Sequence, residues 1–247
     1  MQPTPVAGVT VPGVTVLAPA KLTVSLRVVG VRHDGYHEID AEMVTLDLAD
    51  ELTLVDGGDG LEVVAAGAGL PVPTGDDNLV RRALAVVDRR AAVRLVKRIP
   101  AGAGLGGASA DAAAILRWAG CADPAVAASL GADVPFCLVG GRARVTGIGE
   151  VVHPLPPAER AYTLVVPPFG VPTAEVYRAW DRLGGPHADG PNDLEPAALV
   201  VAPELAEWRD RLAAATGARP ALAGSGSTWF VAGAFPGEGR VVTTTRR

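Results

Sequence analysis

The segment Pro100-Ala101-Gly102-Ala103-Gly104-Leu105-Gly106-Gly107-Ala108-Ser109-Ala110-Asp111 is the most informative part of this chain. Glycine lets the backbone approach a ligand closely and adopt conformations that side chains forbid. The apolar residues 112–118 that follow predict a helix, which ends at about Ala119. A helix N-terminus offers unpaired N–H groups and a partial positive charge, both of which attract phosphate. The segment therefore predicts a phosphate-binding site where a helix begins.

Two better-known glycine loops fit this segment poorly. No Gly-Lys-Ser/Thr follows the glycines, which excludes the Walker A loop. Gly102, Gly104 and Gly107 do match the dinucleotide pattern G-x-G-x-x-G, with Asp123 at a suitable distance. However, residues 97–100 separate the preceding strand from the first glycine, and Asp123 stands in a loop between helices. A tight helix entry without any ligand is a further alternative, which the high density of glycines disfavours.

Bulk composition limits the possible classes of protein. The chain has 247 residues, 49% of them hydrophobic but only 4% aromatic, so its core consists mainly of Ala, Val and Leu. A net charge of −5 without a long basic block argues against a nucleic-acid partner. Cys121 and Cys137 do not form a disulfide framework, and no signal peptide or membrane span is evident. We expect a cytoplasmic protein, monomeric or weakly dimeric, that binds neither nucleic acid nor membrane.

The hydrophobic pattern predicts an α+β fold, because strands and helices cluster rather than alternate strictly. Prolines at positions 154, 156 and 157 predict a domain boundary, with an N-terminal domain of residues 1–157 and a C-terminal domain of residues 158–247. The predicted strands are 14–17, 22–29, 42–48, 51–55, 61–65, 92–96, 136–139, 142–146, 162–166, 229–232 and 240–243. The predicted helices are 78–90, the one after the glycines, 124–130, 173–182 and 202–216.

Several other segments carry residues suited to chemistry. Lys21 stands at the start of a strand, and Asp133 lies between a helix and an apolar segment. Residues 32–37 form a turn followed by Tyr36 and His37, and residues 223–227 form a second glycine-rich turn. Each has an ordinary explanation when taken alone: a solvated lysine, a helix-capping aspartate, a hairpin tip and a simple loop.

Taken together and in this order, these segments resemble the GHMP kinase superfamily of small-molecule kinases, from Ala18 to about Phe230. The Pro-Ala-Lys, Asp-Gly-Tyr-His and Gly-Ala-Asp-Val-Pro motifs, with Asn192-Asp193-Leu194-Glu195, are most similar to one branch. That branch phosphorylates the 2-hydroxyl of a cytidyl-linked methylerythritol in non-mevalonate isoprenoid biosynthesis. The resemblance implies a two-domain GHMP kinase fold, with the active site in the cleft between the domains.

The resemblance also implies the roles of residues on the ATP side. Asp133 would accept the proton of the substrate hydroxyl, and Lys21 would orient both groups and offset developing charge. The backbone of residues 101–109, with Pro100 beside it, would hold the triphosphate of ATP, and Mg²⁺ would be the second cofactor. Asn78, Leu79 and Lys97 would lie near the adenine and ribose. Ser109 is a possible ligand of the metal ion by superfamily analogy.

On the substrate side, the resemblance implies that Tyr36 stacks on the cytosine and His37 hydrogen-bonds its polar edge. Tyr177 would cover the opposite face of the base, and Thr173 would contact the substrate. Thr23 occupies a position where relatives usually carry Asn, so one substrate hydrogen bond is in doubt. The stretch of residues 84–93 and the segment after Glu195 are shorter than in relatives.

Two alternatives remain open at this point. A different small-molecule GHMP kinase would have no use for the aromatic residues Tyr36 and Tyr177. A non-catalytic nucleotide-binding protein on the same fold would not need both Lys21 and Asp133. A kinase acting on the cytidyl substrate is therefore the first hypothesis.

Overall fold

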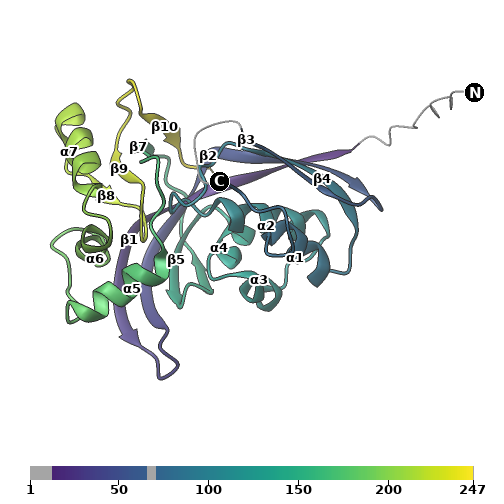
Figure 1. Ribbon diagram of the computed structural model, residues 1–247, viewed down its shortest axis with the longest axis horizontal. Helices are drawn as coiled ribbons and strands as arrows, with labels where there is room; N and C mark the ends of the chain where they lie inside the picture. Colours follow the sequence, from purple (N-terminus) through teal and green to yellow (C-terminus); the bar gives the residue numbers. More distant parts are fainter. Residues whose placement is uncertain (1–12, 66–70, 247) are drawn as a thin grey trace, which may run out of the picture.

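The computed structural model describes residues 13–65 and 71–246, which form two β-sheets with helices packed on them (Figure 1). The first residues of the expected N-terminal domain, 1–12, lie outside the described part of the chain. Within the described part, no helix is long and apolar enough to cross a bilayer. Both cysteines are free thiols.

The larger sheet has six strands in the order β3-β4-β2-β5-β6, with β1 paired to β2. Its strands are antiparallel, except that β3 and β4 are parallel. The first two strands form a long hairpin, whose turn projects at the lower edge of Figure 1 next to α5. The six strands are β1 (Val14–Val31), β2 (His37–Asp56), β3 (Leu61–Ala65), β4 (Ala91–Lys97), β5 (Arg142–Gly147) and β6 (Val151–Pro154).

A bulge in β1 brings Lys21 next to the glycine-rich segment. The sequence predicts separate strands 14–17 and 22–29, because Pro19 lacks the N–H that a sheet ladder requires. The structure instead shows one strand, whose register shifts between Pro19 and Lys21. A bulge can carry a proline within a strand and redirect the side chains next to it. The N–H of Lys21 consequently donates to the carbonyl of Leu105 in the glycine-rich segment, at 3.0 Å.

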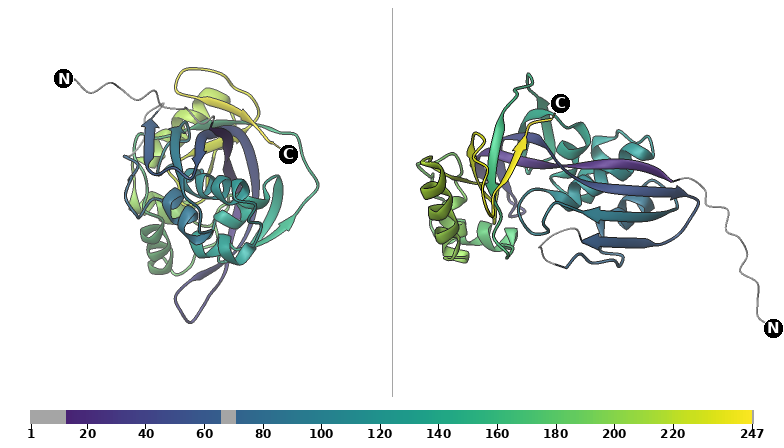
Figure 2. Two further views of the ribbon diagram at one scale, coloured as in Figure 1. Left: turned by 90° about the vertical axis from the view of Figure 1, so that its right-hand side faces the viewer. Right: turned by 90° about the horizontal axis from the view of Figure 1, so that it is seen from above.

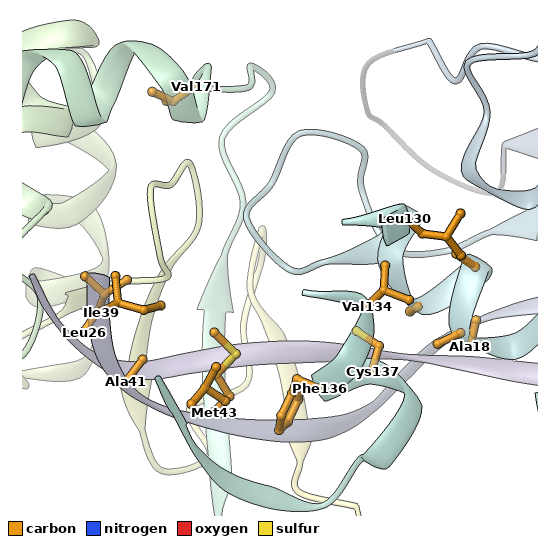
Figure 3. Packing of buried hydrophobic residues seen from close by; sticks show 14 of the residues in the cluster. Ala18, Leu26, Ile39, Ala41, Met43, Leu130, Val134, Phe136, Cys137 and Val171 are labelled. Atoms are coloured by element: carbon orange, nitrogen blue, oxygen red, sulfur yellow. The ribbon is translucent and has the colours of Figure 1, made fainter. Parts of the chain in front are cut away.

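The N-terminal helices cover the larger sheet and bury its apolar side chains. These helices are α1 (Leu79–Val86), α2 (Gly107–Trp118), α3 (Pro124–Leu130) and α4 (Val134–Val139). Figure 3 shows Val134, Phe136 and Cys137 of α4 beside the β1–β2 strands, which contribute Ala18 and Met43 to the same core.

The predicted strand 136–139 is wrong, because these residues belong to α4. A short, continuous apolar run fits a buried strand and a buried helix equally well. Pro135 in the first turn is compatible with the helix, since the first helical N–H groups have no partner within the helix.

The second sheet has four strands in the order β10-β7-β9-β8. Helices α6 and α7 lie at the opposite end of the molecule from α1 and β4 (Figures 1 and 2). The sequence did not predict α6, a short helix that begins at the Asn192-Asp193-Leu194-Glu195 motif. The elements are β7 (Ala161–Val165), α5 (Thr173–Arg182), α6 (Glu195–Val201), α7 (Leu205–Thr216), β8 (Ala221–Leu222), β9 (Trp229–Ala232) and β10 (Val241–Thr244).

Asp193 fastens the long hairpin to the C-terminal half. Its fully buried carboxylate accepts hydrogen bonds from Arg27 at 2.6 Å and from the N–H of Val28 at 3.1 Å. It also accepts from His187 and from the N–H of Ala188, both at 3.0 Å. Burial alone would raise the pKa of Asp193, but these hydrogen bonds outweigh it and lower the pKa below the ordinary value.

We expect Asp193→Asn to lower the free energy of unfolding by about 3 kcal/mol, because an amide leaves buried donors without an acceptor. Urea unfolding monitored by circular dichroism measures this loss. Asp189→Asn is the matched control, since Asp189 is exposed a few residues away. A variant at Asp193 as stable as this control would show that the buried carboxylate does not hold the two halves together.

Candidate active site

The glycine-rich segment wraps around the N-terminus of α2. Gly106 is the N-cap, with a φ of 68° and no side chain to cap the helix. The first helical hydrogen bond runs from the N–H of Ala110 to the carbonyl of Gly106, at 2.8 Å. The N–H groups of Gly107, Ala108 and Ser109 precede that bond, so they can bind an anion at the positive end of the helix.

Two glycines of the segment are required because other parts of the chain lie close to their Cα atoms. A Cβ on Gly104 would lie 2.5 Å from the carbonyl oxygen of Gly226, in the second glycine-rich turn. A Cβ on Gly106 would lie 2.7 Å from the Cγ of Lys21. The first glycine-rich segment is therefore enclosed between the C-terminal half of the chain and the bulge of β1.

We expect Gly104→Ala to raise the KM for ATP about tenfold or more. The φ of +76° already disfavours a side chain by roughly 1–2 kcal/mol, and the added methyl group must also displace the backbone of Gly226. Gly120→Ala is the control, because Gly120 has a φ of +72° but open space around its Cβ. Steady-state kinetics should show a normal KM for ATP in the control, and equal KM values in both variants would contradict this account.

A cavity of about 260 Å³ opens above the glycine-rich segment. All of the residues that the sequence assigned to the nucleotide line this cavity. Besides them, Pro71, Val72, Pro73 and Asp111 contribute to its wall. The assigned residues are Asn78, Leu79, Lys97 and every position from Pro100 to Ser109.

Asn78 and Lys97 also shape the wall of the cavity. The side-chain oxygen of Asn78 accepts from the N–H of Val80 at 2.8 Å and caps α1, while its amide donates to the carbonyl of Pro73 at 2.6 Å. The Lys97 ammonium is buried, where it pairs with Asp50 and donates to Asp111 at 2.7 Å.

The Lys97 ammonium and the two carboxylates form a buried ionic cluster that ties β2, β4 and α2 together. Asp50 additionally accepts from the N–H of Ile99 at 2.8 Å, just before the glycine-rich segment. Burial raises the pKa of Asp111 to about 7, although Lys97 opposes this shift. The sequence analysis missed the cluster, although a lone carboxylate in the apolar helix 107–118 was a detectable signal.

Lys21 and Asp133 meet beside the glycine-rich segment. The Lys21 ammonium lies 3.2 Å from a carboxylate oxygen of Asp133 and donates to the hydroxyl of Thr23 at 3.1 Å. The side chain of Lys21 is only 6% exposed, whereas that of Asp133 is 32% exposed. A buried ammonium thus holds a carboxylate that remains open to a ligand, which is the geometry expected of a base and its partner.

An aromatic group lies near this pair. The His37 ring lies 4.6 Å from the Tyr177 ring, and Trp180 packs against His37 edge-on. Burial raises the pKa of Tyr177, and the nearby Asp133 carboxylate raises it further, so the phenol stays neutral. Tyr177 is therefore in ring contact with His37 and within electrostatic range of the Asp133 carboxylate.

The remaining predicted substrate residues lie in separate environments. Thr173 begins α5, and a hydrogen bond of 2.8 Å joins its hydroxyl to that of Ser225 in the second glycine-rich turn. Tyr36 lies in the hairpin turn with 59% of its surface exposed. The structure thus brings His37 and Tyr177 together, while the Tyr36 ring is left exposed to solvent.

Comparison with known proteins identifies the family to which the chain belongs. Residues 78–141 match the family model of the GHMP kinases N terminal domain. The chain is 38% identical over 233 residues to 4-diphosphocytidyl-2-C-methyl-D-erythritol kinase of Paracoccus denitrificans. The alignment covers 86% of this chain and 84% of the relative. Its identity to the enzyme of that name from Pelotomaculum thermopropionicum is 40% over 258 residues, covering 88% of each chain. The chain belongs to the 4-diphosphocytidyl-2-C-methyl-D-erythritol kinase family.

A solved structure extends the comparison to the fold. The crystal structure of a 4-(cytidine 5'-diphospho)-2C-methyl-D-erythritol kinase superposes with a TM-score of 0.74 at 33% identity, covering 94% of this chain and 98% of that one. The α+β two-domain GHMP kinase fold and the kinase activity expected from the sequence are thereby confirmed. Lys21 and His37 lie outside residues 78–141, the segment that matches the family model of the GHMP kinases N terminal domain.

Proposed function

We propose that this chain transfers the γ-phosphoryl group of ATP to the 2-hydroxyl of 4-diphosphocytidyl-2-C-methyl-D-erythritol, a step of non-mevalonate isoprenoid biosynthesis. The observation that carries the proposal is the contact between Lys21 and Asp133 at 3.2 Å, beside the N-terminus of α2. This contact combines a proton acceptor, a fixed positive charge and a phosphate-binding helix end. Phosphoryl transfer requires positioning and charge stabilisation of this kind.

The reaction balances with these groups alone. The substrate hydroxyl oxygen forms a bond to the γ-phosphorus, the bond to the β,γ-bridging oxygen breaks, and ADP leaves. Asp133 takes the hydroxyl proton, while Lys21 holds Asp133 in place and stabilises the negative charge on the transferring group. Thr23 keeps the Lys21 ammonium aimed at the reacting groups through its hydroxyl, which supports a positioning role in place of the usual Asn.

ATP would bind in this cavity with its phosphates at the N-terminus of α2. Its phosphates lie against the N–H groups from residues 101–109, and its adenine and ribose lie toward Asn78, Leu79 and Lys97. The charge of the helix end favours the triphosphate there. Because the polar atoms of Asn78 and Lys97 are already bonded within the protein, we propose that these residues shape the adenine end of the pocket.

Mg²⁺ is the metal ion expected to accompany the triphosphate. The described residues contain no group of three or more His, Cys, Asp or Glu side chains able to hold a metal ion. Mg²⁺ in kinase sites is held mainly by substrate phosphates and water, with one or two protein oxygens. Ser109 lines the cavity, and its hydroxyl would hold the ion. Bound there, the ion would neutralise charge on the phosphates.

The cytidyl substrate would extend from Asp133 toward His37. We propose that its cytosine lies against Tyr177, with His37 at the polar edge of the base and Tyr36 closing over it from the hairpin turn. Thr173 would contact the substrate near the second glycine-rich turn. Each aromatic ring stacked on a base contributes roughly 1–3 kcal/mol to the binding free energy.

We expect Tyr36→Ala to raise the KM for the cytidyl substrate about tenfold and to leave the KM for ATP within about twofold. Tyr36→Phe keeps the ring and is expected to retain the parent KM. Initial rates measured with each substrate varied in turn provide the test. Equal effects of Tyr36→Ala on both KM values would undo the stacking proposal.

The organisation of the molecule is part of the same proposal. We place the domain boundary between residues 157 and 158. The end of β6 at Pro154 and the start of β7 at Ala161, in a different sheet, support this boundary. We further propose a monomer or weak homodimer that works in the cytoplasm without nucleic acid or membrane.

The direct test of function is a coupled ADP-release assay with the cytidyl-linked methylerythritol, mevalonate and homoserine as separate substrates. The proposal requires the largest kcat/KM for the cytidyl substrate. A larger kcat/KM for mevalonate or homoserine would assign the chain to another GHMP kinase activity. ATP binding without ADP release in all three reactions would indicate a non-catalytic protein.

A further inference from the structure

His37 is held on several sides at the start of β2. Its side chain is 9% exposed, and its Nε2 lies 2.7 Å from a carboxylate oxygen of Asp181. The ring of Tyr177 covers one face of the imidazole, and Trp180 packs edge-on against the ring. Asp181 follows Tyr177 by one helical turn on α5, so both residues reach His37 from the same face of that helix.

Asp181 decides which imidazole nitrogen carries hydrogen. An ionised carboxylate only accepts hydrogen bonds, so Nε2 must be the donor in this contact. In the neutral ring, Nδ1 then carries a lone pair and is an acceptor. No hydrogen bond from the described residues occupies Nδ1, which leaves it available to a ligand.

We infer that Asp181 is a positioning residue that makes His37 select a base bearing an exocyclic amino group, cytosine rather than uracil. The inference rests on the proposed function, in which His37 faces the polar edge of the substrate base. It assigns the choice of base to a residue on α5 that does not itself contact the base.

The two pyrimidines differ at position 4 and at the adjacent N3, which carries hydrogen only in uracil. Cytosine presents an N4 amino group, which donates, whereas uracil presents O4, which accepts. An acceptor at Nδ1 that faces position 4 bonds the amino group of cytosine but meets O4 of uracil with an unpaired lone pair. Buried polar groups left unpaired are the strongest source of discrimination between similar ligands.

Replacing Asp181 should weaken the preference for cytosine over uracil. The amide of Asp181→Asn can accept from Nε2–H or donate to a bare Nε2, so His37 is free to adopt either tautomer. When Nδ1 carries the hydrogen instead, it can donate to O4 of uracil. The effect should appear in the KM for the base-bearing substrate rather than in kcat, because Asp133 and Lys21 are unchanged.

The experiment compares kcat/KM for the cytidine diphosphate-linked methylerythritol and for its uridine counterpart. We expect Asp181→Asn to reduce the cytidine-over-uridine ratio at least tenfold relative to the wild type, with kcat on the cytidyl substrate within about threefold. Glu175→Gln, which removes an exposed carboxylate from the same helix, should leave the ratio unchanged. Nitrogen-15 NMR of the wild type should show His37 protonated at Nε2 when neutral.

Each outcome decides a separate claim. A wild type inactive on the cytidyl substrate would overturn the proposed function. An active wild type whose base preference is the same in Asp181→Asn would overturn the role of Asp181 alone. If Asp181→Asn does not fold, the NMR spectrum of the wild type decides, because a neutral His37 protonated at Nδ1 would contradict the inference.

Discussion

Replacing Asp133 with asparagine is expected to lower kcat about a thousandfold, within the range typical for loss of a general base. Asparagine keeps the shape of the side chain but cannot take the proton of the hydroxyl. The ammonium of Lys21, 3.2 Å away, also loses its counter-charge. Single-turnover measurements of ADP formation report the chemical step directly.

The Kd for ATP should stay within about threefold of the parent in Asp133→Asn, because Asp133 does not line the nucleotide cavity. Asp210→Asn, an exposed change on α7, is the control for loss of a surface carboxylate. A variant at Asp133 with parental turnover would show that another group accepts the proton.

Replacing Lys21 with methionine is expected to lower kcat about 10²- to 10³-fold, as for removal of a single stabilising donor from a catalytic site. Methionine preserves the apolar stem that packs beneath Gly106, so the glycine-rich segment keeps its support. The loss is therefore expected in kcat more than in the KM for ATP.

The double variant Lys21→Met with Asp133→Asn separates a shared role from independent ones. Residues that act as a unit give strongly non-additive effects on kcat. We therefore expect kcat of the double variant to be little lower than kcat of the less active single variant. Losses that multiply would show that Lys21 contributes by binding phosphate rather than by acting with Asp133.

Sequence reasoning located the glycine-rich segment of the candidate site because its signal is local. Glycine is needed wherever positive φ and close approach coincide. The glycines between Gly102 and Gly107 therefore indicate such a backbone directly from the sequence. The positions of Lys21 and Asp133 followed from the resemblance to GHMP kinases. The structure brings these two together, as the resemblance implied.

The parts that sequence reasoning missed depend on long-range packing. The strand β1 continues through Pro19 because a bulge absorbs the missing N–H, and its pairing with β2 fixes where that bulge lies. Asp111 meets Lys97 only when α2 packs against the larger sheet. Asp181 reaches His37 only because α5 lies beside the hairpin turn, and the two residues are 144 positions apart in the sequence.

The most direct test of the central claim is phosphorus NMR of the products formed by the wild type from ATP and the cytidyl-linked methylerythritol. We expect ADP together with one new phosphomonoester on the 2-hydroxyl, with the diphosphate linkage to cytidine intact. Formation of ADP with free inorganic phosphate, or of a phosphate on another hydroxyl, would contradict this expectation.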